Sequence, residues 1–400
     1  MQKVYIVAAK RSAIGAFAGG LSTVTAPALG AAVARDVLKT AGVSADKLDE
    51  VIVGNILPAG CGQGVARQVA VLAGVPVEVP AWGISMACGS GMKAVMSAAA
   101  NIASGTGDLY LAGGTESMSL APYLLPGARQ GLRMGNKEIV DHMVYDALTD
   151  AFENIHMGIT AENIAKKYGI TRAEQDAFAI ASQEKAIRAV DAGAFRAEIT
   201  PITVKVRKEE VVFDTDEYPN RKTSLEKLSA LKPAFLADGT VTAGNASGIN
   251  DGAAFLLIAS ERAIKEHNLT PLAELTAWGQ GGVEPSVMGL GPVPAVRAAL
   301  KMGNLALADM QRIELNEAFA AQSLGVIKLL SEEHGVDKET LLARTNPNGG
   351  AIALGHPVGA SGARIIVTLL AGMHAAGEEM GLASLCIGGG MGTAVVLTAC

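Results

Sequence analysis

The sequence predicts an α/β fold built from two duplicated halves with a segment inserted between them. Short apolar stretches alternate with alanine-rich stretches along the chain, which is the pattern of parallel sheets covered by helices. Half of the residues are hydrophobic, only 4% are aromatic and 47 are glycine, which suits closely packed layers of small aliphatic side chains. At 400 residues, the chain is also too long for one ordinary compact core.

The two ends of the chain contain corresponding segments. Segments 49–55, 86–91 and 109–114 of the first half match, in order and in character, segments 312–316, 355–362 and 383–390 of the second. This similarity indicates an internal duplication. Two related halves packed about a pseudo-twofold axis would bring their strand ends together, where α/β folds usually bind ligands.

The segment from Ser119 to Asn250 differs from both halves because it is richer in charged residues, methionine and proline. We expect it to be an insertion. Within it, Thr171 and Glu174 form a capping box, and apolar residues then recur at helical spacing until Gly193, which predicts a helix. The predicted domains are therefore 1–120 with 251–269, the inserted 121–250, and 270–400.

Charge and cysteine content restrict the class of protein. A formal net charge of -6 argues against nucleic-acid binding and against attraction to an anionic membrane surface. Four cysteines without CxxC spacing do not form a disulfide framework, so we expect a reducing, cytoplasmic compartment and no metal site. The uncharged stretch 12–34 contains four glycines and a proline and is too polar to span a membrane.

Three separated segments each carry a reactive side chain framed by glycines. These side chains are Cys88 in 86–91, His356 in 355–362 and Cys386 in 385–390. A thiol nucleophile, an imidazole that deprotonates it and a second thiol that moves another proton are the parts of a covalent acyl-transfer reaction. The three segments together predict an active site.

Cys88 has two structural interpretations. A free cysteine can be a small buried core residue. Here, however, strand-like residues end at Cys88, Gly89 and Gly91 permit a tight turn, and 92–102 continues as a helix, whose dipole is expected to lower the thiol pKa. The overlapping Gly89-x-Gly91-x-x-Ala94 matches a loose form of the dinucleotide-binding motif, but a nucleophilic thiol directly before the first glycine is not part of that motif.

The other candidates also have structural alternatives. His356 could be a buried structural residue, but the glycines and proline of 355–362 predict an irregular backbone before an apolar helix at 363–374, at a strand-to-helix junction like that of Cys88. Cys386 could be a core thiol, although the N–H groups of 388–390 beside it could stabilise an oxyanion. Asn316 either caps the helix that follows it or orients a water or a substrate carbonyl.

These four motifs, in this order and over essentially the whole chain, resemble those of the thiolases, a coenzyme A-dependent enzyme family. The resemblance implies a five-layered α/β/α/β/α fold of two duplicated domains with a loop domain inserted in the first. It implies that Cys88 is the acylated nucleophile, His356 its activating base and Cys386 the thiol that moves an α-proton. Asn316 would hold a water that, with His356, stabilises the enolate, and the N–H groups of Cys88 and Gly388 would form a second oxyanion hole.

The resemblance also implies a coenzyme A site. Ser247 would hydrogen-bond the pantetheine arm, with Ala243, Ala318 and Phe319 beside it, while Phe235 and Leu148 would flank the nucleotide and Arg221 would pair with the adenosine phosphate region. The alternative for Arg221 is an ordinary solvated loop residue. Segment 219–224 also lacks the His-Gly pair often found after the arginine in bacterial biosynthetic members.

Residues 156–163 resemble the biosynthetic branch of the family, in which His156 lies at the acyl pocket and Met157 and Met288 narrow it. The implied reaction is the reversible condensation of two acetyl-CoA molecules to acetoacetyl-CoA and coenzyme A, without a metal or redox cofactor. The alternatives are a degradative 3-ketoacyl-CoA thiolase of broader chain length and a non-catalytic acyl-CoA-binding scaffold. Segment 122–135 resembles the loop through which two dimers associate as a homotetramer.

Overall fold

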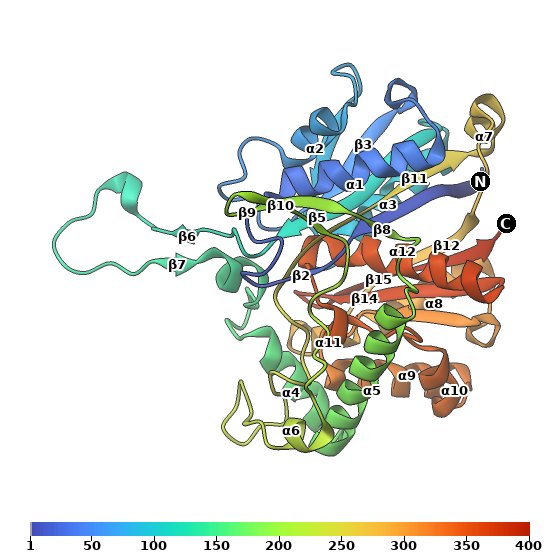
Figure 1. The fold of residues 1–400 in the computed structure, drawn as a ribbon. Helices are drawn as coiled ribbons and strands as arrows, with labels where there is room; N and C mark the ends of the chain where they lie inside the picture. The colour runs from blue at the N-terminus through green and yellow to red at the C-terminus, as the bar shows by residue number, and fades with distance from the viewer. Residues whose placement is uncertain (1) are drawn as a thin grey trace.

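The structure is a computed structural model that describes residues 2–400 (Figure 1). Its main sheet has the strand order β13-β14-β15-β12-β1-β11-β5-β3-β4 and therefore runs through both halves of the chain. The strands are β1 (Val4–Ser12), β3 (Glu50–Gly54), β4 (Ala81–Ile84), β5 (Leu109–Ser117), β11 (Asn250–Ser260), β12 (Ala273–Gly282), β13 (Arg312–Leu315), β14 (Met380–Ile387) and β15 (Met391–Ala399); the short β2 (Gly15–Ala16) and β8 (Ile199–Thr200) attach to β11 and β1.

The pairing of the strands repeats in the two halves. In the first half β3 pairs with β5 in parallel and β5 pairs with β11 antiparallel. In the second half β13 pairs with β14 in parallel and β14 pairs with β15 antiparallel. The halves join where β1 and β12 pair at Tyr5 and Ile6. The internal similarity of the sequence thus corresponds to a repeated sheet topology.

Helices form three layers around the two half-sheets. Helices α1 (Ala26–Ala41) and α2 (Val65–Ala73) cover the outer face of the first half, and α8 (Pro292–Gly303) and α9 (Ala320–His334) cover that of the second. Helices α3 (Ser90–Ser104) and α12 (Val358–Ala376) pack against each other between the half-sheets. The five-layered α/β/α/β/α arrangement expected from the resemblance is confirmed (Figure 1).

Helix α12 is the central helix of the second half and corrects two expectations. It begins at Val358, so Gly359 and Gly362 are helical, and His356 follows the short helix α11 (Ala351–Leu354) rather than a strand. The glycines are needed for close packing, because a Cβ at Gly362 would lie 2.5 Å from the Met92 backbone nitrogen of α3. By length and composition α12 could cross a membrane, but 83% of its apolar window is buried inside the protein.

The inserted segment leaves the first half after β5 and returns to it at β11. It contains helices α4 (Met157–Tyr168), α5 (Arg172–Asp191) and α6 (Leu225–Ser229), and the hairpins β6 (Tyr123–Leu124) with β7 (Val140–Asp141) and β9 (Ile202–Val206) with β10 (Glu209–Phe213). The predicted capping box at the start of α5 is confirmed, and Gly193 just beyond its end adopts φ +71°. The β6–β7 arm projects far from the body (Figure 1). The remaining helices are α7 (Glu261–His267) and α10 (Lys338–Arg344).

Candidate active site

A cavity of about 530 Å³ lies where the two halves meet the inserted segment. Residues from both halves and from the insertion line it. Twelve of the residues singled out in the sequence are among them: Cys88, Leu148, His156, Met157, Phe235, Ala243, Ser247, Met288, Ala318, Phe319, His356 and Cys386. The fold therefore brings the two thiols and the imidazole, which are far apart in the sequence, to one cavity.

Cys88 lies in a tight turn directly before α3. Strand β4 ends at Ile84, earlier than the sequence pattern predicted, and the chain turns through Ala87, whose φ of +40° is unusual for a residue with a side chain. The Ser90 hydroxyl holds this turn by accepting from the Met86 N–H at 2.8 Å and donating to the Ala87 carbonyl at 2.7 Å. The turn thus presents the thiol at the start of the helix.

The pKa of Cys88 differs from the sequence expectation. Burial raises the pKa of this thiol, while hydrogen bonding from the backbone N–H of Gly388 and from its own N–H acts in the opposite direction. The prediction of a lowered pKa was wrong because removal from water disfavours the thiolate more than the helix start favours it. The thiol is therefore protonated in the free protein and needs a base to become a nucleophile.

His356 is held in a defined tautomer. Its Nδ1 lies 2.6 Å from Ser361 Oγ, and the Ser361 hydroxyl donates to the Pro357 carbonyl at 2.9 Å. Because the hydroxyl hydrogen is already used, Ser361 Oγ accepts from Nδ1–H, which leaves Nε2 free to accept a proton. Burial and the nearby Arg364 charge lower the pKa of His356 to about 3, so the ring is neutral. The His356 backbone N–H donates to Asn250 Oδ1 at 2.9 Å.

Cys386 lies near the end of β14 and is only 1% exposed. Burial, together with negative charge on Cys88, raises the pKa of its thiol well above the usual value. A thiolate formed here is a strong base, because its protonated form is so strongly favoured. Its place in the same cavity as Cys88 suits a group that removes a proton from a bound substrate.

Asn316 is fully buried just after β13, and its N–H donates to the Ser384 carbonyl at 3.0 Å. Its side-chain Oδ1 and Nδ2 have no hydrogen-bond partner within residues 2–400. The helix-cap alternative is wrong, since α9 begins at Ala320 and its N-cap is Phe319. A buried amide without partners costs roughly 1–3 kcal/mol, which indicates a place for a water or a ligand group.

The apolar wall of the cavity is built by the start of α4. His156 is the N-cap of α4, and its Nδ1 accepts from the Gly158 N–H at 3.0 Å. Its ring stacks on Phe235, with 4.7 Å between ring centroids, and burial lowers its pKa. The buried Met157 and Met288 also line the cavity, and their acyl-pocket role stays a prediction.

Asn316, Gly388 and Arg221 are not among the residues that line the cavity. Gly388 is nevertheless adjacent to it, because its N–H acts on the Cys88 thiol. Arg221 is exposed and lies at a neighbouring cavity, where its guanidinium donates to both carboxylate oxygens of Asp191 at 3.0 and 2.6 Å. The structure thus separates Arg221 from the thiols.

Sequence reasoning missed three supporting residues: Ser361, Asn250 and Glu116. Glu116 is buried and accepts from Asn55 Nδ2 at 2.6 Å and from the N–H groups of Ile56, Leu57 and Gly359 at 3.0, 3.1 and 3.0 Å. It therefore connects the loop after β3 to the first turn of α12, near His356. Burial raises the pKa of Glu116 to about 7. The sequence signal for Glu116 was a glutamate within an apolar strand pattern. The only sequence signal for Ser361 was its place in the His356 motif.

Cys61, Cys88, Cys386 and Cys400 are free thiols. Within residues 2–400, the structure contains no group of three or more His, Cys, Asp or Glu side chains that could hold a metal ion. Two thiols, Cys88 and Cys386, and two imidazoles, His156 and His356, line the cavity, and the Gly388 N–H lies next to the Cys88 thiol.

Comparison with known proteins extends over the whole chain. The family model of the thiolase N-terminal domain matches residues 4–262, and that of the thiolase C-terminal domain matches residues 269–399. A Pseudomonas aeruginosa protein named acetyl-CoA acetyltransferase is 54% identical over 398 residues, which is 99% of each chain. A protein of the same name from Syntrophomonas wolfei is 50% identical over 400 residues, covering 100% of this chain and 99% of the relative.

Solved structures agree with this assignment. The acetyl-CoA acetyltransferase from Syntrophomonas wolfei superposes with a TM-score of 0.97 at 43% identity, covering 100% of both chains. Human mitochondrial 3-ketoacyl-CoA thiolase in complex with CoA gives a TM-score of 0.93 at 42% identity, covering 100% of this chain and 98% of the other. With matched domain models at both ends and the same fold throughout, the chain belongs to the thiolase family.

Proposed function

We propose that this thiolase joins two acetyl-CoA molecules into acetoacetyl-CoA and coenzyme A, and catalyses the reverse thiolysis. The observation that carries the proposal is the convergence of Cys88, His356 and Cys386 on one cavity, with the His356 tautomer set by Ser361. The relatives named acetyl-CoA acetyltransferase, about half identical over their full length, support the same reaction. Coenzyme A is then a substrate and a product, and the steps below need no metal or redox cofactor.

In the first half-reaction, His356 Nε2 accepts the Cys88 proton as the sulfur attacks the acetyl carbonyl carbon. The negative charge that develops on the carbonyl oxygen is accepted by the N–H groups of Cys88 and Gly388. The C–S bond to coenzyme A then breaks, and the departing thiolate takes the proton from His356. The low pKa of His356 suits this step, because an imidazolium in so buried a place readily returns its proton.

In the second half-reaction, Cys386 as thiolate removes an α-proton from a second acetyl-CoA. The resulting enolate attacks the acetyl carbon on Cys88, the new C–C bond forms, and the bond from the Cys88 sulfur to the acyl carbon breaks. Cys88 leaves as a thiolate and takes the proton from Cys386, which restores the Cys88 thiol and the Cys386 thiolate. We assign Asn316 to hold a water that hydrogen-bonds the enolate oxygen together with His356. The unpartnered, buried Asn316 side chain supports this role.

Substrate length is tested by thiolysis with free coenzyme A. The purified protein is assayed with acetoacetyl-CoA, 3-ketohexanoyl-CoA and a longer homologue, and the three turnover rates are compared. The buried Met157 and Met288 favour turnover confined to acetoacetyl-CoA. Comparable turnover of the longer substrates would instead assign the degradative 3-ketoacyl-CoA reaction, which the similarity to the human mitochondrial thiolase makes the second candidate.

Catalysis is separated from simple binding by mass spectrometry of the protein after incubation with acetyl-CoA. We expect an acetyl group on Cys88 that is absent from the Cys88→Ala variant. A chain that binds acetyl-CoA without acetylation, and whose affinity is the same in that variant, would be a non-catalytic acyl-CoA-binding scaffold.

We also propose a homotetramer in the cytoplasm, formed as a dimer of dimers. The β6–β7 arm supports this, since Tyr123 and Ile139 are each 63% exposed and Met134 is fully exposed. Strand β4 is the last strand of the main sheet, with Trp82 partly exposed on it, which supports pairing with a second copy. Light scattering of the intact chain and of a variant with 126–137 replaced by a short Gly-Ser turn should give a tetramer and a dimer, respectively.

A further inference from the structure

Glu317 is a buried carboxylate directly after Asn316, and no step of the proposed reaction uses it. It is 2% exposed and lies between the end of β13 and the start of α9. Its Oε2 accepts from Ser182 Oγ at 2.6 Å and from the Ile352 N–H at 3.2 Å, and its Oε1 accepts from Asn346 Nδ2 at 2.7 Å. These donors belong to α5, to α11 and to the loop between α10 and α11. One side chain therefore joins four segments of the fold.

The loop between α10 and α11 is shaped around this carboxylate. Asn346 adopts φ +46°, and its amide is bound to β13 at both ends: Nδ2 donates to the Leu315 carbonyl at 2.8 Å and Oδ1 accepts from the Leu315 N–H at 2.9 Å. The Gly350 N–H donates to Ser182 Oγ at 3.1 Å, and a Cβ at Gly350 would lie 2.2 Å from the Glu317 carboxyl carbon. The Asn346 amide cannot turn over without losing both bonds to Leu315.

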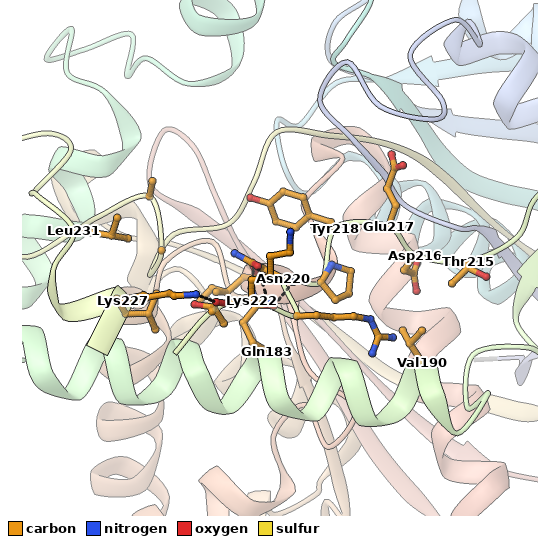
Figure 2. Close-up of a pocket in the computed structure, with 17 residues that line it drawn as sticks. Gln183, Val190, Thr215, Asp216, Glu217, Tyr218, Asn220, Lys222, Lys227 and Leu231 are labelled. Atoms are coloured by element: carbon orange, nitrogen blue, oxygen red, sulfur yellow. Dashed lines mark hydrogen bonds between the residues drawn. The ribbon is translucent and has the colours of Figure 1, made fainter. Parts of the chain in front are cut away.

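Helix α11 is held at Ile352 from two sides. The Ile352 N–H donates to Glu317, and the Ile352 carbonyl accepts from Gln183 Nε2 at 3.3 Å. Gln183 Oε1 in turn accepts from the Asn220 N–H at 2.9 Å, and Figure 2 shows Gln183 reaching Asn220 from α5. Helix α11 ends two residues before His356. The contacts at Ile352 therefore fix the segment that leads into His356.

We propose that Glu317 is the positioning residue that sets Asn316 and His356 relative to each other. It holds the Asn316 segment by its own place in the chain and the His356 segment through Ile352. This proposal rests on the proposed function, in which a water on Asn316 and the His356 ring bind the same enolate oxygen. Two groups that share one oxygen need a fixed separation, because a displacement of about 1 Å can cost roughly 100-fold in rate.

The arrangement around Glu317 requires a carboxylate, because all three of its partners are donors and both of its oxygens accept. In Glu317→Gln the side chain keeps its size but has a single oxygen. Where that oxygen faces Ser182 and Ile352, the amide nitrogen faces Asn346 Nδ2, which is itself a donor. The opposite orientation places the nitrogen against the Ile352 N–H. In either orientation one donor is left facing another, and the two segments move apart.

The test measures two rates in Glu317→Gln: acetylation of Cys88 by acetyl-CoA, by rapid-quench mass spectrometry, and acetoacetyl-CoA formation, by absorbance. Acetylation should change little, because His356 keeps its contacts with Ser361 and Asn250. Acetoacetyl-CoA formation should fall by about tenfold to 100-fold, the range expected for a displacement of up to about 1 Å. The loss should appear in kcat rather than in the KM for acetyl-CoA.

Two further variants calibrate this loss. Ser182→Ala removes one of the three donors, so it should lower acetoacetyl-CoA formation in the same way but by a smaller factor than Glu317→Gln. Glu339→Gln makes the same chemical change at an exposed position of α10 and is the matched control, in which neither rate should change.

A double-mutant cycle separates positioning from general support of the fold. If Glu317 acts through Asn316, Glu317→Gln should add little to the loss of acetoacetyl-CoA formation in Asn316→Ala, whereas independent losses multiply. Multiplying losses overturn the proposal, and so does an unchanged rate of acetoacetyl-CoA formation in Glu317→Gln or an equal loss in both steps. If Glu317→Gln does not fold, the same cycle with Ser182→Ala decides. Failure of the unaltered protein to become acetylated on Cys88 would instead overturn the proposed function.

Discussion

Ser361 sets the protonation pattern of His356: its Oγ accepts from the imidazole Nδ1–H at 2.6 Å while its own hydroxyl donates to the Pro357 carbonyl. The two residues are five positions apart in the sequence, and the first turn of α12 brings them together. The ring is thereby oriented with Nε2 as its only acceptor.

Replacing Ser361 by alanine should lower kcat by about 100-fold, because the neutral His356 ring can then adopt either tautomer. This factor is at the low end of the rate contributions that a positioned general base makes. The KM for acetyl-CoA should change little, since Ser361 lines neither cavity. Steady-state kinetics and the urea midpoint of unfolding check this together. Ser104→Ala, at an exposed position of α3, is the control. A change confined to KM would contradict the positioning role.

Replacing Asn316 by alanine should separate the two half-reactions. Cys88 acetylation by acetyl-CoA should continue near its normal rate, while acetoacetyl-CoA formation should fall by about 10²-fold or more, because the enolate loses its hydrogen-bonded water. Rapid-quench mass spectrometry measures the first step, and absorbance of the product measures the second. Equal losses in both steps would argue that Asn316 only supports the fold.

Replacing Met288 by alanine should widen the acyl pocket. Met288 is 3% exposed and lines the cavity, so thiolysis of 3-ketohexanoyl-CoA should rise relative to acetoacetyl-CoA. The free energy of unfolding should fall by about 2–5 kcal/mol, as for other buried methionines. Met302→Ala on α8, at a 37% exposed position, should change neither property. An unaltered substrate ratio in Met288→Ala would mean that another wall limits chain length.

The buried Glu314 should make stability depend on pH. Its carboxylate oxygens accept no hydrogen bond within residues 2–400, Arg364 Nη1 lies 3.9 Å away, and burial raises its pKa to about 8. A carboxyl whose pKa is higher in the folded state stabilises the protein below its unfolded pKa of about 4.5, and this contribution is lost as pH rises to about 8.

The Glu314→Gln variant cannot ionise at this position. Urea unfolding at pH 5 and pH 8.5 should therefore show a larger loss of stability for the unaltered protein than for the variant. The difference should amount to a few kcal/mol, because one unit of pKa corresponds to about 1.4 kcal/mol. Equal pH dependence in the two proteins would show that Glu314 is ionised to the same extent in the folded and unfolded states.

Local sequence patterns predicted the helix starts and turns whose formation depends on residues close together in the chain. The capping box of Thr171 and Glu174 joins residues three positions apart at the start of a helix, and the glycine-framed Cys88 predicted a turn before a helix. The acyl-pocket and coenzyme A residues came from the resemblance to the thiolases, and nine of those ten residues line one cavity. Their catalytic and binding roles remain predictions.

Local sequence patterns did not predict how closely elements pack or how deeply side chains are buried. Gly359 and Gly362 suggested an irregular loop, but they are helical because α12 must approach α3 and β5 more closely than a Cβ allows. The Cys88 pKa was expected to be lowered, but it is raised because neighbouring layers remove the thiol from water.

The sequence by itself determined the duplicated α/β architecture, the inserted segment and the reactive side chains, because periodicity, glycines and residue type act locally. The tertiary structure alone decided that Ser361 orients His356, that the buried Asn316 side chain has no partner among residues 2–400 and that Asp191 pairs with Arg221. Hydrogen bonds and charges depend on distances between residues remote in the chain or on different turns, and those distances exist only once the layers have packed.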